Sequence, residues 1–315
     1  MRENNNILNK PIVICLLACI CCILWGSAFP SIKIGYTLFH IAENDTASQM
    51  LFAGYRFTLA GILALIIGCV FSKRILIPKK SSYKSILKLS MVQTVLQYVC
   101  FYVGLANTTG TKASIIEASN VFLAILIPAL ILKHEKLTLQ KLTGCIIGFI
   151  GVVIINLSGN TIDLNMKFSG EGLIFLSALF YAISSILIKE YSKKELPIIL
   201  SAYQFMLGGI IMVIIGFLSG GRIEAYSLNA ILLLIYMAFI SAIAYSLWAI
   251  LLKYNPVGKV AIYGFLNPIC GVILSAILLK EGSVFNVMGI ISLIMVCIGI
   301  YLVNKDNRYP AKRKE

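Results

Sequence analysis

The chain is divided into ten apolar runs, each about as long as a helix that crosses a lipid bilayer. A transmembrane helix needs about 20 predominantly apolar residues. Of the 315 residues, 59% are hydrophobic and only 13% are charged, which excludes an ordinary soluble domain. The sequence therefore predicts an all-α integral membrane protein with ten transmembrane helices. The predicted spans lie near residues 12–37, 48–70, 86–106, 111–132, 140–157, 170–190, 197–218, 228–252, 258–279 and 284–303.

The basic residues predict which side of the membrane each loop faces. The chain carries 27 Lys and Arg against 13 Asp and Glu, and most of the cations lie in alternate loops, as Lys73, Arg74, Lys79 and Lys80 do. Loops rich in Lys and Arg stay on the cytoplasmic side. We therefore expect a multi-pass protein of the plasma (inner) membrane whose two termini, including a basic tail at residues 305–315, are cytoplasmic. Short basic runs between spans do not indicate nucleic-acid binding.

The second half of the sequence resembles the first. Residues 55–62 (YRFTLAGI) match residues 203–210 (YQFMLGGI) at five of eight positions, with an offset of 148. Three further matches keep the same order, and one of them pairs Tyr98 with Tyr245. An internal repeat of this length determines the architecture before any single residue does.

The repeat predicts two five-span halves, residues 1–157 and 158–304. Because five is odd, the second half enters the membrane from the opposite side, so the two halves form an inverted repeat. Two inverted halves can exchange conformations and open a midplane site alternately to either side. This architecture indicates a transporter.

Several short motifs resemble the EamA family of the drug/metabolite transporter superfamily. They are residues 25–30 (WGSAFP) with Lys33, the pair Arg56-Phe57, Glu135 followed by Leu137, Thr138 and Gly144, and Asn267-Pro268 with Leu279, Lys280 and Glu281. The resemblance covers nearly the whole chain. It implies a ten-span carrier of small metabolites, often an exporter of amino acids or related compounds, with its cavity between the two halves. One departure is visible, because Pro268 precedes Glu281 by 13 residues whereas Phe122 holds the equivalent place in the first half.

Two charged residues lie well inside predicted spans, where an ionisable side chain is expensive and usually functional. Glu117 is expected to bind a proton, as a coupling ion, or a substrate ammonium group. Arg56 lies about 12 Å into its span by helical rise and suits bidentate contact with a carboxylate. The alternatives are structural. Arg56 would pin its span against a neighbour through an ion pair, and Glu117 would pair with Arg56 or Lys112 or lie high enough in its span to reach the outer headgroups. The position equivalent to Arg56 is Gln204, which is polar but uncharged.

The first span combines a large ring, small residues and a helix breaker within six positions, Trp25 to Pro30. This combination predicts a local helix break at Pro30, with Trp25 and Ser27 facing the cavity; Pro268 predicts a second break in the ninth span. A packed kink with Trp25 as filler is the alternative. Lys33 is expected near the outer headgroups or facing the cavity.

Polar and aromatic side chains share one face in several spans. Gln93 and Gln97 are four residues apart, and two amides facing lipid would be costly. Polar and aromatic residues in other spans have the same spacing, so we expect all of them to line one cavity of neutral polar groups and aromatic rings. The alternative is hydrogen bonding that only joins helices. The remaining predicted lining residues are Tyr98, Asn120, Tyr181, Ser184, Ser185, Ser241, Tyr245, Trp248, Tyr263 and Asn267.

These observations favour an alternating-access exporter of amino acids or related small metabolites. A lipid-headgroup flippase and a facilitated-diffusion uniporter remain as alternatives. An enzyme is not indicated, because the histidines, His40 and His134, lie near span ends and no acids are paired. All nine cysteines lie inside apolar runs without metal-ligand spacing. We expect no metal, no cofactor and no obligatory protein partner; the partners are the substrate, the lipid bilayer and, if transport is coupled, protons.

Overall fold

The computed structural model describes residues 7–42, 44–108, 110–131, 137–157, 166–223, 227–279 and 287–305. Within these ranges the chain is helical throughout and contains no strand. Eight helices are long and apolar enough to cross a membrane, and two shorter apolar helices, Ile115–Leu130 and Leu139–Ile154, occupy the places of the fourth and fifth predicted spans. The expected all-α membrane protein is confirmed. Among the described residues, eight helices rather than ten are long enough to cross the bilayer, and the ten-span count stays a prediction.

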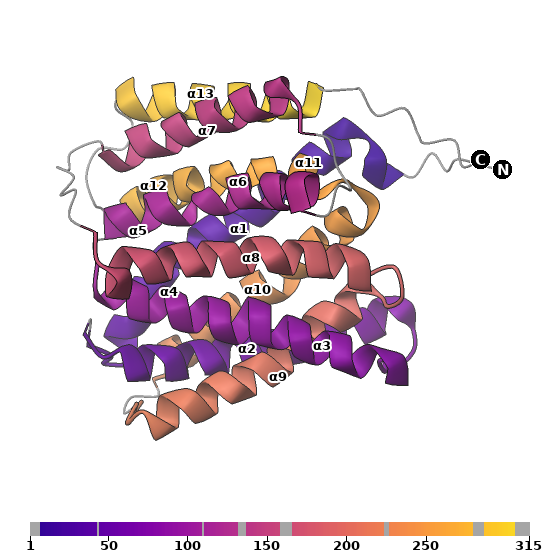
Figure 1. The fold of residues 1–315 in the computed structure, drawn as a ribbon. Helices are drawn as coiled ribbons and strands as arrows, with labels where there is room; N and C mark the ends of the chain where they lie inside the picture. Colours follow the sequence, from indigo (N-terminus) through magenta and orange to yellow (C-terminus); the bar gives the residue numbers. More distant parts are fainter. Residues whose placement is uncertain are drawn as a thin grey trace.

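The helices follow the predicted order of spans (Figure 1). In the first half they are α1 (Pro11–Leu38), α2 (Thr46–Ser72), α3 (Tyr83–Leu89), α4 (Gln97–Ala106), α5 (Gly110–Glu117), α6 (Ser119–Leu126) and α7 (Leu139–Leu157). A π-helical segment, Ser90–Leu96, joins α3 to α4, and another, Ile127–Ile131, extends α6. Short 3₁₀ turns, Ile7–Asn9 and Lys80–Ser82, precede α1 and α3.

The second half has the same series of long helices. They are α8 (Leu173–Tyr191), α9 (Pro197–Leu218), α10 (Leu228–Tyr254), α11 (Val257–Ala261), α12 (Leu266–Leu279) and α13 (Val287–Lys305). A π-helical segment, Phe168–Gly172, leads into α8, and a 3₁₀ segment, Ile262–Phe265, joins α11 to α12.

Local chemistry sets several helix ends. The Asp45 carboxylate accepts a hydrogen bond from the Ser48 N–H (2.9 Å) at the start of α2, and the Ser227 hydroxyl oxygen accepts one from the Ala230 N–H (3.1 Å) at the start of α10. At the other end of α2, Lys73 adopts a left-handed conformation (φ 50°), which turns the chain sharply out of the helix. These caps determine where the loops leave the bundle.

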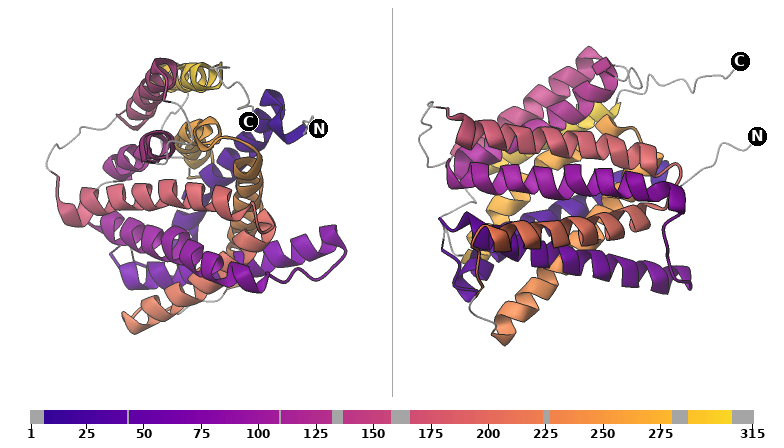
Figure 2. Two further views of the ribbon diagram at one scale, coloured as in Figure 1. Left: turned by 45° about the vertical axis from the view of Figure 1, so that its right-hand side comes forward. Right: turned by 60° about the horizontal axis from the view of Figure 1, so that its bottom comes forward.

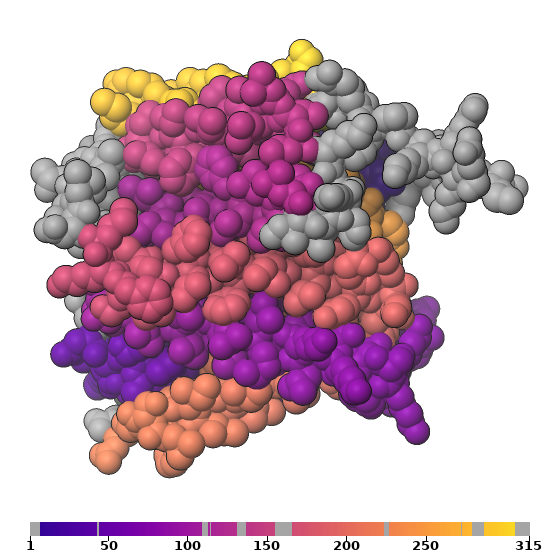
Figure 3. All heavy atoms as spheres, in the orientation of Figure 1, coloured from indigo at the N-terminus to yellow at the C-terminus, as the bar shows by residue number. Residues whose placement is uncertain are grey.

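Helix packing has the same pattern in both halves of the sequence. The most extensive contact is α2 against α9, followed by α7 against α13. Besides these, α1 packs against α10 and α12, and α8 packs against α4 and α6 (Figures 1 and 2). The space-filling view shows the side chains closing the spaces between α8, α4 and α9 on one face (Figure 3).

Glycines allow the two most extensive contacts to be close. A Cβ at Gly209 in α9 would lie 2.4 Å from the backbone nitrogen of Thr58, and one at Gly54 in α2 would lie 2.6 Å from that of Val213. At the α7–α13 contact, a Cβ at Gly299 would lie 2.6 Å from the carbonyl oxygen of Gly144. Small residues at such positions let helix backbones approach each other in a membrane, where apolar burial alone gives little attraction.

Two spans are interrupted near the middle. The fourth is broken at Ala118, between α5 and α6, and the ninth at Ile262–Phe265, between α11 and α12. Pro268 lies in the first turn of α12, directly after the break, where a proline without an N–H is tolerated. The sequence did not predict the break at Ala118, because its only nearby proline, Pro128, lies further along.

The predicted break at Pro30 is wrong, because α1 is one helix from Pro11 to Leu38 with Pro30 inside it. Hydroxyl groups support the backbone around the proline: Ser31 Oγ donates to the carbonyl of Ser27 (2.8 Å), and Ser27 Oγ donates to that of Leu24 (2.7 Å). These bonds go to carbonyls near Gly26, whose own carbonyl loses its helical donor at Pro30.

Some predicted features lie outside the described residues. They are Glu135, Lys280 and Glu281 of the family-like motif, the side chain of Lys112, and the basic tail beyond Lys305.

Candidate functional site

The Arg56 guanidinium lies near the middle of α2, about 15 Å along the helix from Thr46. The side chain is 4% exposed. Its Nε and Nη2 atoms donate to the hydroxyl oxygen of Ser241 in α10, at 3.1 and 3.0 Å, and its Cζ lies 5.3 Å from the centre of the Phe57 ring. Among the described residues, Ser241 is the only hydrogen-bond partner of this cation, and no carboxylate faces it. A buried cation that contacts only a neutral hydroxyl retains capacity for an anion.

The same contact occurs in uncharged form in the other half. Thr94 Oγ1, in the π-helical segment before α4, donates to Gln204 Oε1 in α9 at 2.6 Å. Gln204 follows Arg56 by 148 positions, and Ser241 follows Thr94 by 147. The two pairs are therefore equivalent under the sequence repeat. The equivalent contact, between α9 and the π-helical segment before α4, is thus made by a neutral amide and a hydroxyl.

Two further pairs join residues that the repeat makes equivalent. The hydroxyls of Tyr98 and Tyr245 are hydrogen-bonded at 2.8 Å, and the rings of Phe57 and Phe205 are stacked at 5.3 Å with an interplanar angle of 7°. The members of each pair are 147 and 148 positions apart. Both tyrosines lie close enough to Arg56 to interact with it electrostatically. The centre of the protein is therefore a layer of rings and hydroxyls beside one cation.

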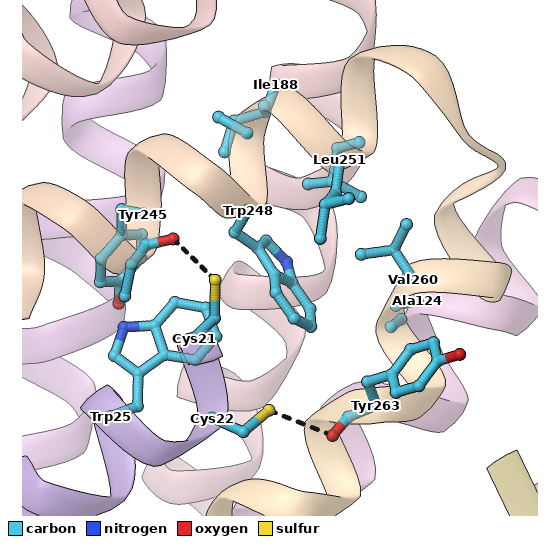
Figure 4. Close-up of a cluster of buried hydrophobic side chains, with 14 of the residues drawn as sticks. Cys21, Cys22, Trp25, Ala124, Ile188, Tyr245, Trp248, Leu251, Val260 and Tyr263 are labelled. Carbon is cyan, nitrogen blue, oxygen red and sulfur yellow. Dashed lines mark hydrogen bonds between the residues drawn. The ribbon is translucent and has the colours of Figure 1, made fainter. Parts of the chain in front are cut away.

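Rings from α1 and α8 flank this tyrosine pair. Trp25 of α1 makes edge contacts with Tyr245 and Trp248 of α10, with ring centres 5.0 Å apart in each case (Figure 4). Tyr181 of α8 lies within electrostatic reach of Tyr98. The sequence repeat also aligns Trp25 with Tyr181. The predicted aromatic lining is thus brought together at one place.

Glu117 lies at the break in the fourth span, as the last residue of α5. Asn120 supports the break by donating from Nδ2 to the carbonyl oxygen of Glu117 (2.7 Å). The carboxylate oxygen Oε2 is buried, and the Ser177 hydroxyl of α8 is its polar neighbour, within reach of a hydrogen bond although outside the ordinary bonding geometry. In the part of the chain that the structure describes, no ion pair joins Glu117 to Arg56.

The acid and the cation both lie within electrostatic range of one tyrosine. Tyr245 interacts electrostatically with both Arg56 and Glu117, and Tyr181 also interacts with Glu117. The two charges therefore lie on one aromatic site without neutralising each other directly. The residue equivalent to Glu117, 147 positions later, is Gly264, which lies within the second break. This charge, like that of Arg56, therefore belongs to the first half alone.

Several buried polar atoms around the site lack partners. Buried polar groups in folded proteins are nearly always hydrogen-bonded, so an orphan atom marks a place where a ligand or water is expected. Asn267 follows Asn120 by 147 positions, so an asparagine accompanies each helix break. Among the site residues and predicted lining residues, the atoms of this kind are Trp25 Nε1, Gln97 Oε1, Glu117 Oε2, Ser177 Oγ, Gln204 Nε2 and Asn267 Oδ1.

Other predicted lining residues use their polar groups within the helices. Ser184 and Ser185 both donate to the carbonyl oxygen of Tyr181, at 2.7 and 3.2 Å. The Ser27 hydroxyl accepts a hydrogen bond from Tyr236 of α10 (3.0 Å). These three serines are buried, and their bonds stabilise backbone or join helices rather than leaving a group for a substrate.

The last predicted candidates are Gln93, Tyr263 and Lys33, and they do not share one environment. Gln93 is 2% exposed and Tyr263 is 4% exposed, and the carbonyl oxygen of Tyr263 accepts a hydrogen bond from the Cys22 thiol at 3.3 Å (Figure 4). Lys33 is exposed on α1, away from the buried site. No cluster of His, Cys, Asp or Glu in the described residues could hold a metal ion.

Sequence analysis missed four residues of the site, Phe57, Thr94, Ser177 and Phe205. The repeat offset would have found Thr94, because it is equivalent to the predicted Ser241. Nothing in the sequence distinguishes Ser177 from the other serines of its span.

Comparison with known proteins agrees with this architecture. The model of the EamA-like transporter family matches residues 12–157 and 168–305. An uncharacterized transporter of Archaeoglobus fulgidus is 30% identical over 294 residues, covering 91% of this chain and 96% of that protein. The uncharacterized transporter YetK of Bacillus subtilis is 25% identical over 275 residues, covering 84% and 82%.

Two more distant similarities are also informative. A chloroplastic WAT1-related protein of Arabidopsis thaliana is 24% identical over 290 residues, covering 89% of this chain and 66% of that protein. A solved crystal structure with 12% sequence identity has a TM-score of 0.75 and covers 91% of this chain and 94% of its own, which shows a shared fold. The family and the names of the relatives indicate a transporter rather than an enzyme.

Proposed function

The chain belongs to the EamA-like transporter family, and on that premise we propose that it is an alternating-access carrier that exports amino acids or closely related zwitterionic metabolites. One observation carries the proposal. On a site whose contacts are repeated in both halves, only Arg56 and Glu117 are charged, and the equivalent positions hold Gln204 and Gly264. Charges that packing does not require are expected to serve a ligand.

The chemistry of the site fits a zwitterion. The planar guanidinium of Arg56 suits bidentate contact with a substrate carboxylate. Glu117, which also lies within electrostatic range of Tyr245, suits an ammonium group, and its buried carboxylate has Ser177 as its polar neighbour. Trp25 and the tyrosines supply rings for the apolar part of the substrate.

The arrangement of helices supports alternating access. We propose that residues 1–157 and 158–304 form inverted repeats of five spans, with α5–α6 and α7 crossing the membrane as the fourth and fifth spans. The contacts of α1 with α10 and α12 correspond to those of α8 with α4 and α6, so exchanging the two sets could open the site to opposite sides. The two broken spans lie beside the site, where an interrupted helix leaves backbone groups for a ligand.

Membrane orientation is part of the proposal. The loops at residues 73–82 and 192–196 lie at the end of the bundle where α1 begins and α13 ends (Figure 1). Their lysines and arginines support a cytoplasmic location for this end, and therefore for both termini, in the plasma membrane. Reporter fusions at Lys80 and Gly220 should give cytoplasmic and external signals, respectively; the reverse pattern would contradict the orientation.

Counterflow tests the proposal. Protein in liposomes loaded with one unlabelled amino acid should accumulate the same labelled amino acid transiently, and a panel of amino acids, nucleobases and sugars should identify the substrate. Proton coupling predicts that an imposed pH gradient drives accumulation in the wild type and that Glu117→Gln abolishes this effect. Counterflow that does not depend on the pH gradient in either protein would favour the uniporter. No counterflow of any compound in the panel, together with transbilayer movement of labelled lipid, would favour the flippase.

A further inference from the structure

A hollow of about 460 Å³ lies at the proposed cytoplasmic end of the bundle, where the loop after α2 meets the loop between α8 and α9 and the end of α10. Five basic side chains line it, and Glu195 is its one acid. The basic residues are Arg74, Lys79, Lys193, Lys194 and Lys253. No part of the proposed transport site contributes to it.

The walls of this hollow are fixed by side-chain and backbone contacts. Buried Leu76 anchors the loop after α2, and its carbonyl oxygen accepts a hydrogen bond from the Tyr203 hydroxyl of α9 (3.1 Å). The N–H of Lys79 donates to Glu195 Oε2 (2.9 Å), and Lys79 Nζ donates to the carbonyl oxygen of Lys194 (2.9 Å). The two loops are therefore held together before any ligand arrives, which reduces the cost of ordering them.

The single acid is occupied within the protein. Besides the Lys79 N–H, Glu195 accepts from the N–H of Leu196 (3.1 Å). Burial opposes ionisation of this carboxyl, but these donors outweigh it and lower its pKa. Lys193 forms an ion pair with Glu190 at 2.7 Å. The hollow consequently presents a net positive charge.

Apolar side chains continue from the hollow to the surface. Ile75 and Ile77 line the hollow or flank it and are 80% and 67% exposed, and Phe71 at the end of α2 is 85% exposed. Cations next to exposed apolar side chains at the end of a membrane helix match the boundary between phosphate headgroups and acyl chains. A free phosphate in the cytoplasm would use the cations but not the apolar rim.

We propose that this hollow binds the phosphodiester headgroup of an anionic phospholipid of the inner leaflet, with its acyl chains along the exposed apolar side chains of α2 and its loop. If these cations served only to orient the protein in the membrane, their number near the span ends would matter and no preformed hollow would be needed. The lipid is bound and stays in its leaflet. The proposal is independent of the transported substrate.

Binding to the purified full-length protein in detergent tests this inference. Phosphatidylglycerol and phosphatidylcholine are titrated against the protein, and bound lipid is counted by native mass spectrometry. The test variant is Arg74→Gln/Lys253→Gln. The matched control, Lys80→Gln/Lys84→Gln, removes the same charge at the same end from exposed residues outside the hollow.

We expect the wild type to bind phosphatidylglycerol and to discriminate against phosphatidylcholine. The test variant should bind phosphatidylglycerol about thirty-fold more weakly, the effect of two cations near a lipid phosphate. The control should change affinity less than about three-fold. If the double variant does not elute as a single folded species, Lys194→Gln should weaken binding about five-fold instead.

Three results would overturn the proposal. They are equal binding of the two lipids, an equal loss of affinity in the test variant and the control, and displacement of phosphatidylglycerol by millimolar inorganic phosphate. The last result would identify a site for free phosphate. A carrier with normal counterflow and no lipid preference would refute this site and leave the proposed function intact.

Discussion

Replacing Arg56 with glutamine separates a structural role from a ligand-binding one, because the second half of the protein already has this arrangement. Gln204 meets Thr94 where Arg56 meets Ser241. Arg56→Gln therefore installs a side chain that is known to fit between the same types of helix. The variant removes a charge that is 4% exposed and has two hydrogen bonds to one neutral hydroxyl.

A structural role and a ligand-binding role for Arg56 predict different changes in the free energy of unfolding and in substrate affinity. Hydrogen bonds to a charged group contribute about 1.5–3 kcal/mol each, whereas burying an unpaired ion costs several kcal/mol, so the two effects nearly cancel. We expect the free energy of unfolding to change by less than about 1 kcal/mol, or to rise. Loss of a bidentate contact with a substrate carboxylate should cost about 3 kcal/mol, which weakens substrate binding about 150-fold.

The assay compares thermal unfolding with substrate affinity in the same detergent. Unfolding midpoints of wild type and Arg56→Gln should agree within a few degrees, while the substrate found by counterflow should protect only the wild type. Gln204→Met is a control for polarity at the equivalent position without charge. A midpoint lowered by the equivalent of about 3–5 kcal/mol, the cost of breaking a buried ion pair, would refute the reasoning and assign Arg56 a structural role.

Three further predictions concern packing and pH. Gly209→Ala should destabilise the protein by about 1–3 kcal/mol in thermal unfolding, because its Cβ would lie 2.4 Å from the Thr58 nitrogen; an unchanged midpoint would contradict the close α2–α9 contact. Tyr98→Phe, which removes the bond to Tyr245, should cost about 1 kcal/mol in the same measurement and leave folding intact, whereas complete loss of folded protein would not fit. Hydrogen-bond donors lower the pKa of Glu195, so the ionised carboxylate stabilises the folded protein above the ordinary glutamate pKa of about 4.3, and this stabilisation is lost as pH falls through the lower folded value. Glu195→Gln should therefore reduce the fall of the unfolding midpoint with pH below about pH 4.3. The same pH dependence of the midpoint in wild type and variant would refute this prediction.

The sequence predicts the membrane fold well because each of its signals is local and repeated. Apolar length identifies the spans, and the match of residues 55–62 to 203–210 relates the helices, α2 and α9, that pack most extensively. The positions of helix breaks are harder to predict from the sequence. Pro30 lies inside the continuous helix α1, whereas the fourth span breaks at Ala118, well before its proline, Pro128.

The candidate site is predicted only in part for a similar reason. Residue type indicates that Arg56 and Glu117 need special surroundings, but partner choice depends on how the helices rotate. The sequence suggests a possible pair between them, and the structure instead places Arg56 on Ser241. Serines look alike in sequence, yet Ser184 bonds to its own helix while Ser241 faces the cation.

The central claim is that Arg56 receives the carboxylate of the transported molecule. The direct measurement is competition in counterflow between the identified amino acid and its carboxyl-blocked amide, in wild type and Arg56→Gln. We predict that the wild type prefers the free carboxylate by about 100-fold and that Arg56→Gln shows almost no preference, since both ligands then lack the contact. An equal preference in the two proteins would contradict the account.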